Sequence, residues 1–327
     1  SGTAAANYFP AIIEANYCRV PLIVITADRP DYLVGSGENQ TIHQKNLYGC
    51  HVRYFMDVGL PVEDPINMTH HIFSAVIMSL GINGEGLLLN PAGPVHINVP
   101  FEEPLIPETK NISLEKIEPG IHYAIPPIQY SKVSEDIIEN LPGGETIIIC
   151  GRIDDAQSKL SILKLSEFIN APIFADPISG LRYWKYNKNI ITTYDLFLRN
   201  EMIEPELVIR FGSKPTSKIL CNKLNEWSHK TILVDSIGRF NDNCKIVINS
   251  RIKNFCEKGI SQNSRASQKS KTAKKIKLLE SEYRKTISDY IQKQPMFEGS
   301  VVTVCIASLK NEDNLIIGNS MPIRDAD

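Results

Sequence analysis

The sequence predicts an α/β protein with parallel, doubly wound sheets, in which helices cover both faces of each sheet. Short apolar runs rich in Ile and Val recur along the chain, and segments with helical spacing separate them. Single strands separated by helices are typical of parallel sheets. Apolar residues make up 43% and charged residues 22% of the 327 residues, a composition that supports a sizeable core. At about 150 residues per domain, this length favours two domains or more.

The first part of the chain begins with helical spacing over residues 1–18. Pro10 lies inside that pattern, so the helix is expected to be kinked or to begin late. Residues 21–26 (PLIVIT) form an apolar, β-branched run that is typical of a buried parallel strand. Residues 65–80 then predict a helix, and residues 94–99 (PVHINV) predict a second buried strand.

A proline-containing segment of low regularity, about 105–130, separates this part from a clearer series of strands and helices. Five short apolar runs predict its strands: 146–150, 171–175, 206–211, 231–235 and 245–249. Two helical patterns lie between them: 156–169 and 216–227. This alternation predicts a second domain with its own parallel sheet.

The end of the chain changes character. Residues 261–279 are polar and carry six Lys or Arg between Arg265 and Lys277 without an acidic residue. Nucleic-acid binding is one interpretation, but the charge is local and no aromatic residues are interleaved, which favours a linker that continues into a solvated helix face. A helix is expected over 280–293, and strands over 300–306 and 313–317.

Composition also limits the class of function. The formal net charge of -2 gives no electrostatic reason to expect nucleic acid or an anionic membrane as the main partner. No apolar run approaches the 18 residues that indicate a transmembrane helix. The seven cysteines are scattered and never form a C-x-x-C pair, which favours reduced thiols in the cytoplasm. The sequence contains no G-x-G-x-x-G, Walker A, H-E-x-x-H or G-x-S-x-G motif.

Polar residues gather directly after three apolar runs, at 26–30, 212–218 and 318–324. In open α/β sheets the carboxyl ends of the strands are where ligands bind. Arg29 has the planar donor geometry that suits a carboxylate, and a helix cap is expected at Thr216 or Ser217. Each stretch alone is a capped turn with a surface cation. Three cationic stretches together favour a substrate with more than one carboxylate.

The motifs at these positions closely resemble those of one family. They are Ser1-Gly2-Thr3-Ala4, LIVITADRP at 22–30, Asn39-Gln40-Thr41-Ile42-x-Gln44, Val95-His96-Ile97-Asn98, Arg210-Phe211-Gly212 with Pro215-x-Ser217-Lys218, and Gly318-Asn319-Ser320-Met321-Pro322-Ile323-Arg324. Their order and approximate spacing resemble the MenD family, the 2-succinyl-5-enolpyruvyl-6-hydroxy-3-cyclohexene-1-carboxylate synthases of menaquinone biosynthesis. The combination of TADRP, NQxIxQ and GNSxxxR makes the resemblance specific.

The resemblance implies an order of domains, including a thiamine-diphosphate-binding fold that is present in part. Residues 1–107 would form most of a pyrimidine-binding domain, and 108–134 a linker. Residues 135–258 would form a Rossmann-like middle domain, 259–279 a basic linker and helix start, and 280–327 the start of a diphosphate-binding domain. Both ends look cut, so we expect an internal piece of a longer protein.

The resemblance also implies a transferase that depends on thiamine diphosphate with Mg2+ or Mn2+. It would decarboxylate 2-oxoglutarate and add the resulting carbanion to isochorismate, as a homodimer or homotetramer. Arg29 and Gln40 would contact isochorismate, Lys218 would supply a further cation, and Ser320 and Arg324 would hold the distal carboxylate of the succinyl group. Three residues would lie near the cofactor: Ser1, Gly2 and Thr3.

The sequence departs from the family pattern in ways that limit this assignment. The glutamate that activates the cofactor lies upstream of the Ser1-Gly2-Thr3 motif in the family, and no Gly-Asp-Gly metal motif occurs here. We therefore assign no catalytic and no metal residue and expect this chain by itself to be inactive. Lys214 stands where a smaller or apolar residue is expected. Two alternatives stay open: a carboligase of the acetolactate synthase type, whose mono-acid substrates need fewer cations, and a non-catalytic scaffold, which needs none.

Overall fold

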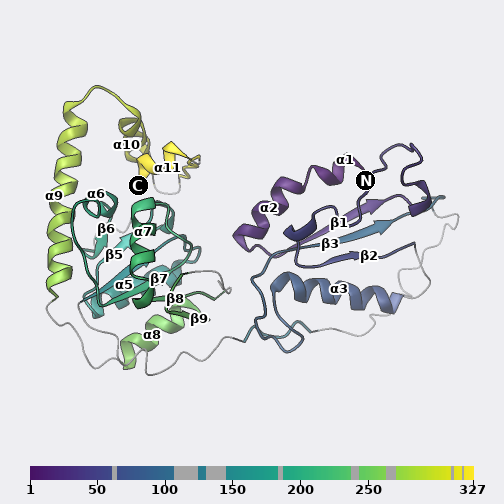
Figure 1. The fold of residues 1–327 in the computed structure, drawn as a ribbon, viewed down its shortest axis with the longest axis horizontal. Helices are drawn as coiled ribbons and strands as arrows, with labels where there is room; N and C mark the ends of the chain where they lie inside the picture. Colours follow the sequence, from purple (N-terminus) through teal and green to yellow (C-terminus); the bar gives the residue numbers. More distant parts are fainter. Residues whose placement is uncertain are drawn as a thin grey trace. The chain divides into compact units, whose positions relative to one another are not determined.

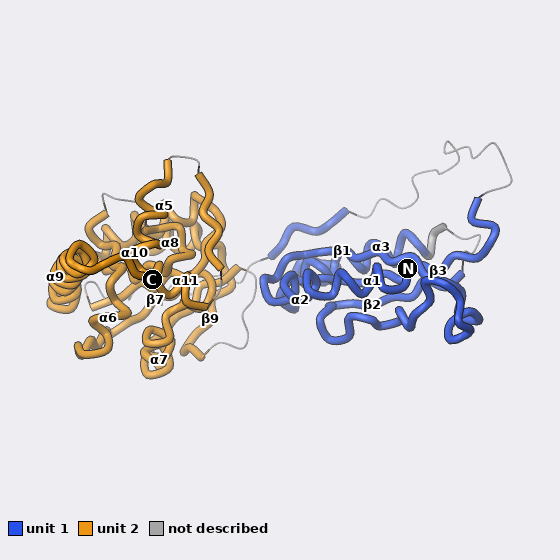
Figure 2. The backbone as a smooth tube through the Cα atoms, turned by 90° about the horizontal axis from the view of Figure 1, so that it is seen from above, with its two compact units in different colours: residues 1–130 blue, residues 131–327 orange. Residues whose placement is uncertain are grey.

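The structure is a computed structural model, and it divides the chain into two compact units, Ser1–Tyr130 and Ser131–Asp327 (Figure 2). It describes the following residues: 1–60, 65–106, 124–129, 145–182, 187–236, 243–262, 270–310, 313–318 and 320–327. The expected linker at 108–134 lies outside these residues except for 124–129, and so does 263–269 of the basic stretch. Among the described residues, no helix is both long enough and apolar enough to cross a membrane.

The first unit is a three-stranded parallel sheet in the order β1–β3–β2, with helices on both faces (Figure 1). Its helices and strands are α1 (Thr3–Ala6), α2 (Phe9–Cys18), β1 (Leu22–Asp28), β2 (Phe55–Asp57), α3 (Pro65–Leu80) and β3 (Pro94–Pro100). Short 3-10 helices lie at Asp31–Leu33 and Gly49–His51. Pro10 falls in the first turn of α2, where its fixed φ suits the helix. Residues 1–18 thus form two helices, α1 and α2, instead of the single kinked or late-starting helix that the sequence predicted.

The second unit contains a six-stranded parallel sheet in the order β6–β5–β4–β7–β8–β9. Numbered from β4, this order is 3-2-1-4-5-6, which is the Rossmann arrangement. Its strands are β4 (Thr146–Cys150), β5 (Ile173–Ala175), β6 (Ile190–Ile191), β7 (Leu207–Phe211), β8 (Thr231–Val234) and β9 (Ile246–Ile248). The topology confirms the predicted Rossmann-like, doubly wound sheet.

Helices cover both faces of this second sheet (Figure 1). They are α5 (Ala156–Phe168), α6 (Tyr194–Phe197), α7 (Lys218–Glu226), α8 (Ile252–Gln262) and α9 (Lys271–Lys293). The unit also contains α10 (Glu298–Ser308) and α11 (Met321–Ala326). In the central strand β4, Ile148 packs with α5 and α8, whereas Ile147 and Ile149 pack with α6, α7 and α9. All three isoleucines are fully buried, which explains why β4 is apolar without alternation.

Two carboxylates fix α9 to the rest of the unit. Glu145, just before β4, accepts hydrogen bonds from the Lys271 backbone N–H and from the Ser270 and Thr272 hydroxyls at the start of α9. Glu280, inside α9, accepts bonds from both backbone N–H groups and both hydroxyls of Thr192 and Thr193. The basic residues from Lys271 to Lys277 thus belong to the first turns of a packed helix.

The strand predicted at 300–306 is wrong, because these residues belong to α10. Residues 313–317, also predicted as a strand, carry no regular secondary structure. A strand is stabilised by pairing with a neighbour, whereas a helix satisfies its backbone locally. No strand of the described residues pairs with residues 300–306, so these β-branched residues form a helix, whose hydrogen bonds lie within the segment.

Candidate functional site

The carboxyl ends of β1 and β3 in the first unit form a buried polar cluster. Thr26 lies opposite Asn98 in the parallel register, and both side chains are buried. The Asn98 amide N–H groups donate to Asp28 Oδ2 at 2.8 Å and to Asp57 Oδ2 at 3.1 Å. The Thr26 hydroxyl donates to Asn98 Oδ1 at 2.8 Å. Three strands therefore contribute to one network at the edge where ligands are expected.

His96 joins this network through Thr26. Its Nε2 lies 2.7 Å from Thr26 Oγ1, and Nδ1 has no hydrogen-bond partner among the residues that the structure describes. Because Thr26 has a single proton and gives it to Asn98, the imidazole must carry its proton on Nε2 and donate to Thr26. The ring also packs against Tyr48 and Phe55, with centroids 4.6 and 5.1 Å away. Burial lowers the pKa of His96 to about 4, so the ring is neutral at physiological pH.

The predicted cofactor residues and one predicted substrate residue meet beside this cluster. The Ser1 hydroxyl lies 3.4 Å from Gln40 Oε1, and the Gly2 backbone N–H donates to Gln44 Oε1 at 2.5 Å. Gly2 has φ +65°, and a side chain at this position would come within 2.9 Å of the Gln40 carbonyl oxygen. A glycine is therefore required here. Thr3 is exposed at the first position of α1.

Arg29 follows directly after β1, and its backbone N–H donates to Asp28 Oδ1 at 2.8 Å. Its side chain lines a pocket of about 330 Å3. The same pocket is lined by Glu38, Glu102 and Glu103, three exposed carboxylates that the sequence analysis did not single out. The lining residues of this pocket therefore include one cation and three carboxylates.

Sequence reasoning missed most of the polar cluster, because its members come from separate parts of the chain. His96 and Asn98 stand inside the buried run PVHINV, and a polar residue in a fully buried strand was the available signal. Asp57 lies at the end of β2, a strand that was not predicted. Lys45, which pairs with Asp31 at 2.6 Å and approaches Asp57 at 3.7 Å, had no distinguishing signal.

In the second unit, Lys218 is the exposed first residue of α7. The N-cap is Ser217, whose Oγ accepts the Leu220 N–H, so the second of the two cap positions expected from sequence is occupied. Ser217 also donates to Asp195 Oδ1 at 2.5 Å. Lys214, unexpected for the family pattern, is exposed in the loop that precedes this cap.

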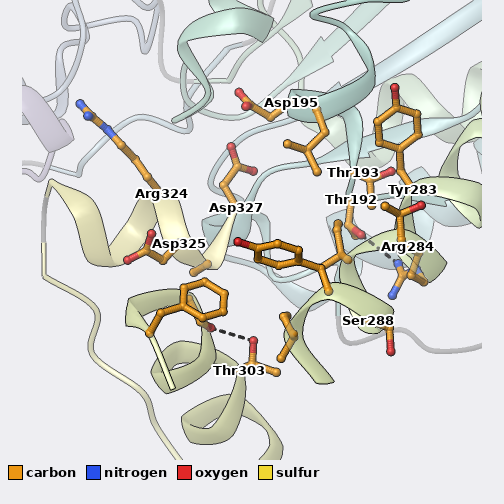
Figure 3. Close-up of a pocket in the computed structure, with 18 of the residues that line it drawn as sticks. Thr192, Thr193, Asp195, Tyr283, Arg284, Ser288, Thr303, Arg324, Asp325 and Asp327 are labelled. Atoms are coloured by element: carbon orange, nitrogen blue, oxygen red, sulfur yellow. Dashed lines mark hydrogen bonds between the residues drawn. The ribbon is translucent and has the colours of Figure 1, made fainter. Parts of the chain in front are cut away.

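Arg324 lines a cavity of about 980 Å3 among α6, α9, α10 and α11 (Figure 3). Its guanidinium points away from Tyr283 and Arg284 in this view. Lys218 and Ser320 are not lining residues of the cavity, so the described structure of this unit does not bring the three predicted residues together there. Ser320 is exposed at the N-cap of α11 with φ +76°.

Asp327, which lines this cavity, forms an ion pair. Arg182 Nη2 lies 2.6 Å from Asp327 Oδ1, and the Tyr194 hydroxyl donates to the same oxygen at 2.9 Å. Burial raises the pKa of Asp327, although Arg182 and the Tyr194 hydrogen bond oppose this effect. Residues of α9 form the largest part of the lining, and residues in and around α6 and α11 supply most of the rest.

A divalent metal with a bound diphosphate does not fit the donors of the described residues. No group of three or more His, Cys, Asp or Glu side chains in this part of the chain is arranged to hold a metal ion. The buried Asp28 and the partly exposed Asp57 both accept a hydrogen bond from Asn98. We therefore derive no chemical step through such a group from this chain.

Fold and site together define an α/β protein in which a Rossmann-like unit accompanies a parallel unit with a polar strand-end cluster. No model of a known protein family matches the chain. Curated 2-succinyl-5-enolpyruvyl-6-hydroxy-3-cyclohexene-1-carboxylate synthases, however, match it over 100% of its length. They include those of Bacillus velezensis (36% identical), Staphylococcus epidermidis (35%) and Geobacillus thermodenitrificans (34%). The chain is thus similar to the synthases that its motifs indicate, and it spans 57–58% of the length of these relatives.

Proposed function

We propose that the protein carrying this chain is a transferase of menaquinone biosynthesis that joins 2-oxoglutarate, after decarboxylation, to isochorismate. The observation that carries the proposal is the similarity to synthases of that name over the whole of this chain, with 33–36% identity among those compared. The strand-end cluster of the first unit supports it, because Ser1, Gly2 and Gln40 are in contact there. Such a protein would act in the cytoplasm, as a homodimer or homotetramer.

Thiamine diphosphate with Mg2+ or Mn2+ is the proposed cofactor of the whole protein. When bound, it supplies the electron sink that decarboxylation of a 2-oxo acid requires. We propose that its metal and diphosphate are held by residues outside the described part of this chain. The turn at Ser1–Thr3 is the part of the chain proposed to lie near it.

The chain's own contribution is to bind and orient two polyanionic substrates. Arg29 and Gln40 would hold isochorismate, Lys218 would add positive charge, and Ser320 and Arg324 would hold the distal carboxylate of the succinyl group. A guanidinium binds a carboxylate through two parallel N–H donors, which fixes orientation as well as charge. The neutral His96 and the carboxylates of Asp28 and Asp57 stay beneath this surface and hold the strand ends in place.

The test is turnover by the protein that carries this sequence, supplied with both substrates, thiamine diphosphate and Mg2+. We expect isochorismate consumption that requires 2-oxoglutarate. Arg29→Ala should raise the KM for isochorismate by roughly 10- to 100-fold, since a hydrogen bond to a charged group contributes about 1.5–3 kcal/mol. Arg152→Ala, which removes an exposed guanidinium paired with Asp154, is the matched control.

Other outcomes separate the alternatives. Turnover of pyruvate but not of 2-oxoglutarate would favour a carboligase of the acetolactate synthase type. No turnover and no binding of either substrate would favour a non-catalytic scaffold. An unchanged KM in Arg29→Ala would contradict the role assigned to this residue.

A further inference from the structure

Gln44 is a buried side chain beside the strand-end cluster, only 1% exposed, and its amide makes three hydrogen bonds. Its Oε1 accepts the Gly2 backbone N–H at 2.5 Å. Its Nε2 donates to the Ala27 carbonyl oxygen at 2.9 Å and to Asn98 Oδ1 at 3.1 Å. One amide therefore links the turn before α1, the end of β1 and strand β3.

The orientation of this amide is fixed by its surroundings. Asn98 gives both of its N–H groups to Asp28 and Asp57, so its Oδ1 must accept, and the Gln44 atom facing it must be the donor. The Ala27 carbonyl oxygen imposes the same requirement. The remaining Gln44 atom is then an oxygen, which matches the Gly2 N–H. The arrangement has no equivalent flipped form.

The linked turn carries the residues proposed to face the ligands. Gly2 packs on the Gln40 backbone so closely that no side chain fits between them, and the Ser1 hydroxyl reaches the Gln40 side chain. Ala27 lies two residues before Arg29 on the same strand end. A shift of the Gln44 amide would therefore move the turn, and Gln40 with it, relative to Arg29.

We propose that Gln44 is a positioning residue, which holds the Ser1–Thr3 turn and Gln40 in register with Arg29 without touching substrate. The role assigned to the turn, to Gln40 and to Arg29 rests on the proposed function. The structural part, that Gln44 fixes the turn to the strand ends, rests on the three hydrogen bonds alone.

Gln44→Met tests this, because methionine preserves the length of the side chain and removes all three hydrogen bonds. Val95→Ala is the control, since Val95 is a fully buried residue at the opposite end of β3 and its truncation weakens the same sheet. We expect Gln44→Met to raise the KM for isochorismate about 10-fold or more, as misplacement of binding groups by about 1 Å costs up to about 100-fold. Val95→Ala should leave that KM within about twofold, since it moves none of these groups.

Gln44→Glu provides a second, pH-dependent variant. A neutral carboxylic acid can accept from Gly2 and donate to Ala27 or Asn98, whereas a carboxylate would face two acceptors. The nearest titratable groups are Asp28 and Asp57 through Asn98, His96 through Thr26, and Lys45 beside Asp57. We expect the KM of this variant to approach that of the unmodified protein at low pH and to rise as pH increases, beyond any change in the unmodified protein.

Amide hydrogen exchange of the peptide covering residues 1–8 measures the structural part without activity. Faster exchange there in Gln44→Met, but not in Val95→Ala, is expected. If the unmodified protein turns over both substrates while Gln44→Met keeps its KM and its exchange protection, the positioning role is wrong. If the unmodified protein shows no turnover, the proposed function fails, and the exchange result still decides whether Gln44 holds the turn.

Discussion

The imidazole of His96 links the pH of the solution to the stability of the first unit. It is fully buried, and burial lowers its pKa to about 4 from an ordinary value near 6.5. A histidine whose folded pKa is depressed favours the unfolded state when it is protonated. Stability from this group is therefore intact above about pH 6.5 and falls by about 1.4 kcal/mol per pH unit as the pH drops toward 4.

His96→Gln should remove this part of the pH dependence and flatten the fall of unfolding free energy between pH 6.5 and 4. The measurement is denaturant-induced unfolding at a series of pH values. His43→Gln deletes an exposed imidazole from the same unit and serves as the control, with an unchanged slope expected. Equal slopes for the unmodified protein and His96→Gln would show that the buried ring is not the titrating group.

Thiol reactivity gives a second prediction at the level of single residues. Cys150 and Cys256 are buried, and burial raises the pKa of both thiols above the ordinary range. Cys18, Cys50 and Cys305 are exposed. Because the thiolate is the reactive form, the exposed three should be alkylated in the native protein and the buried two only after unfolding. Mass spectrometry of alkylated peptides measures this, and native labelling of Cys150 would contradict the placement of β4 in the core.

The packing of α9 against the rest of its unit depends on a buried charge. Glu280 is 8% exposed and accepts hydrogen bonds from Thr192, Thr193 and Arg284. Glu280→Gln places amide N–H groups against these donors, so we expect a loss of about 2 kcal/mol in unfolding free energy. Glu282→Gln makes the same change at an exposed position of α9 and should cost less than about 0.5 kcal/mol.

The difference between Glu280→Gln and the unmodified protein should itself depend on pH. Burial alone would raise the pKa of Glu280, but hydrogen bonds from Thr193, Arg284 and Thr192 outweigh it and lower the pKa below its ordinary value. A depressed carboxyl pKa stabilises the fold above the unfolded pKa and loses that contribution as pH falls through the folded pKa. The two proteins should therefore converge in strong acid, and a constant difference down to pH 2 would contradict this assignment.

Strands that lie inside apolar, β-branched runs were predictable from sequence, whereas β2, β6 and the helix α10 were not. TIIIC and ELVIRF mark β4 and β7 because both faces of these central strands are buried. Strands β2 and β6, with three and two residues, were not predicted, whereas the three-residue strands β5 and β9 were, because they lie inside the longer apolar runs APIFA and KIVIN. SVVTVCI has strand composition but forms α10, since pairing partners, not propensity, decide a strand. In the candidate site, the TADRP motif could be recognised from sequence. The contacts of His96 and Asn98 with Thr26 could not, because they depend on the register of the sheet.

At the scale of the whole molecule, each unit has a hydrophobic core of its own. The first unit has small clusters around Val95 and Ile97 and around Ile12 and Val24. Its strand β1 also leaves Ile23 and Ile25 exposed, at 39% and 64%. The second unit has larger clusters on both faces of its six-stranded sheet. More buried apolar area stabilises the second unit more strongly, so the first should unfold under milder conditions.

We therefore expect two unfolding transitions in scanning calorimetry. Val95→Ala should lower the unfolding free energy of the first transition only, by about 2 kcal/mol, because apolar burial is lost. Ile149→Ala should lower the unfolding free energy of the second transition only, by about 2–5 kcal/mol, because Ile149 is fully buried in the central strand β4. Each substitution is the control for the other, since their cores share no residue. A single transition that both substitutions shift would show that the two cores unfold as one cooperative body.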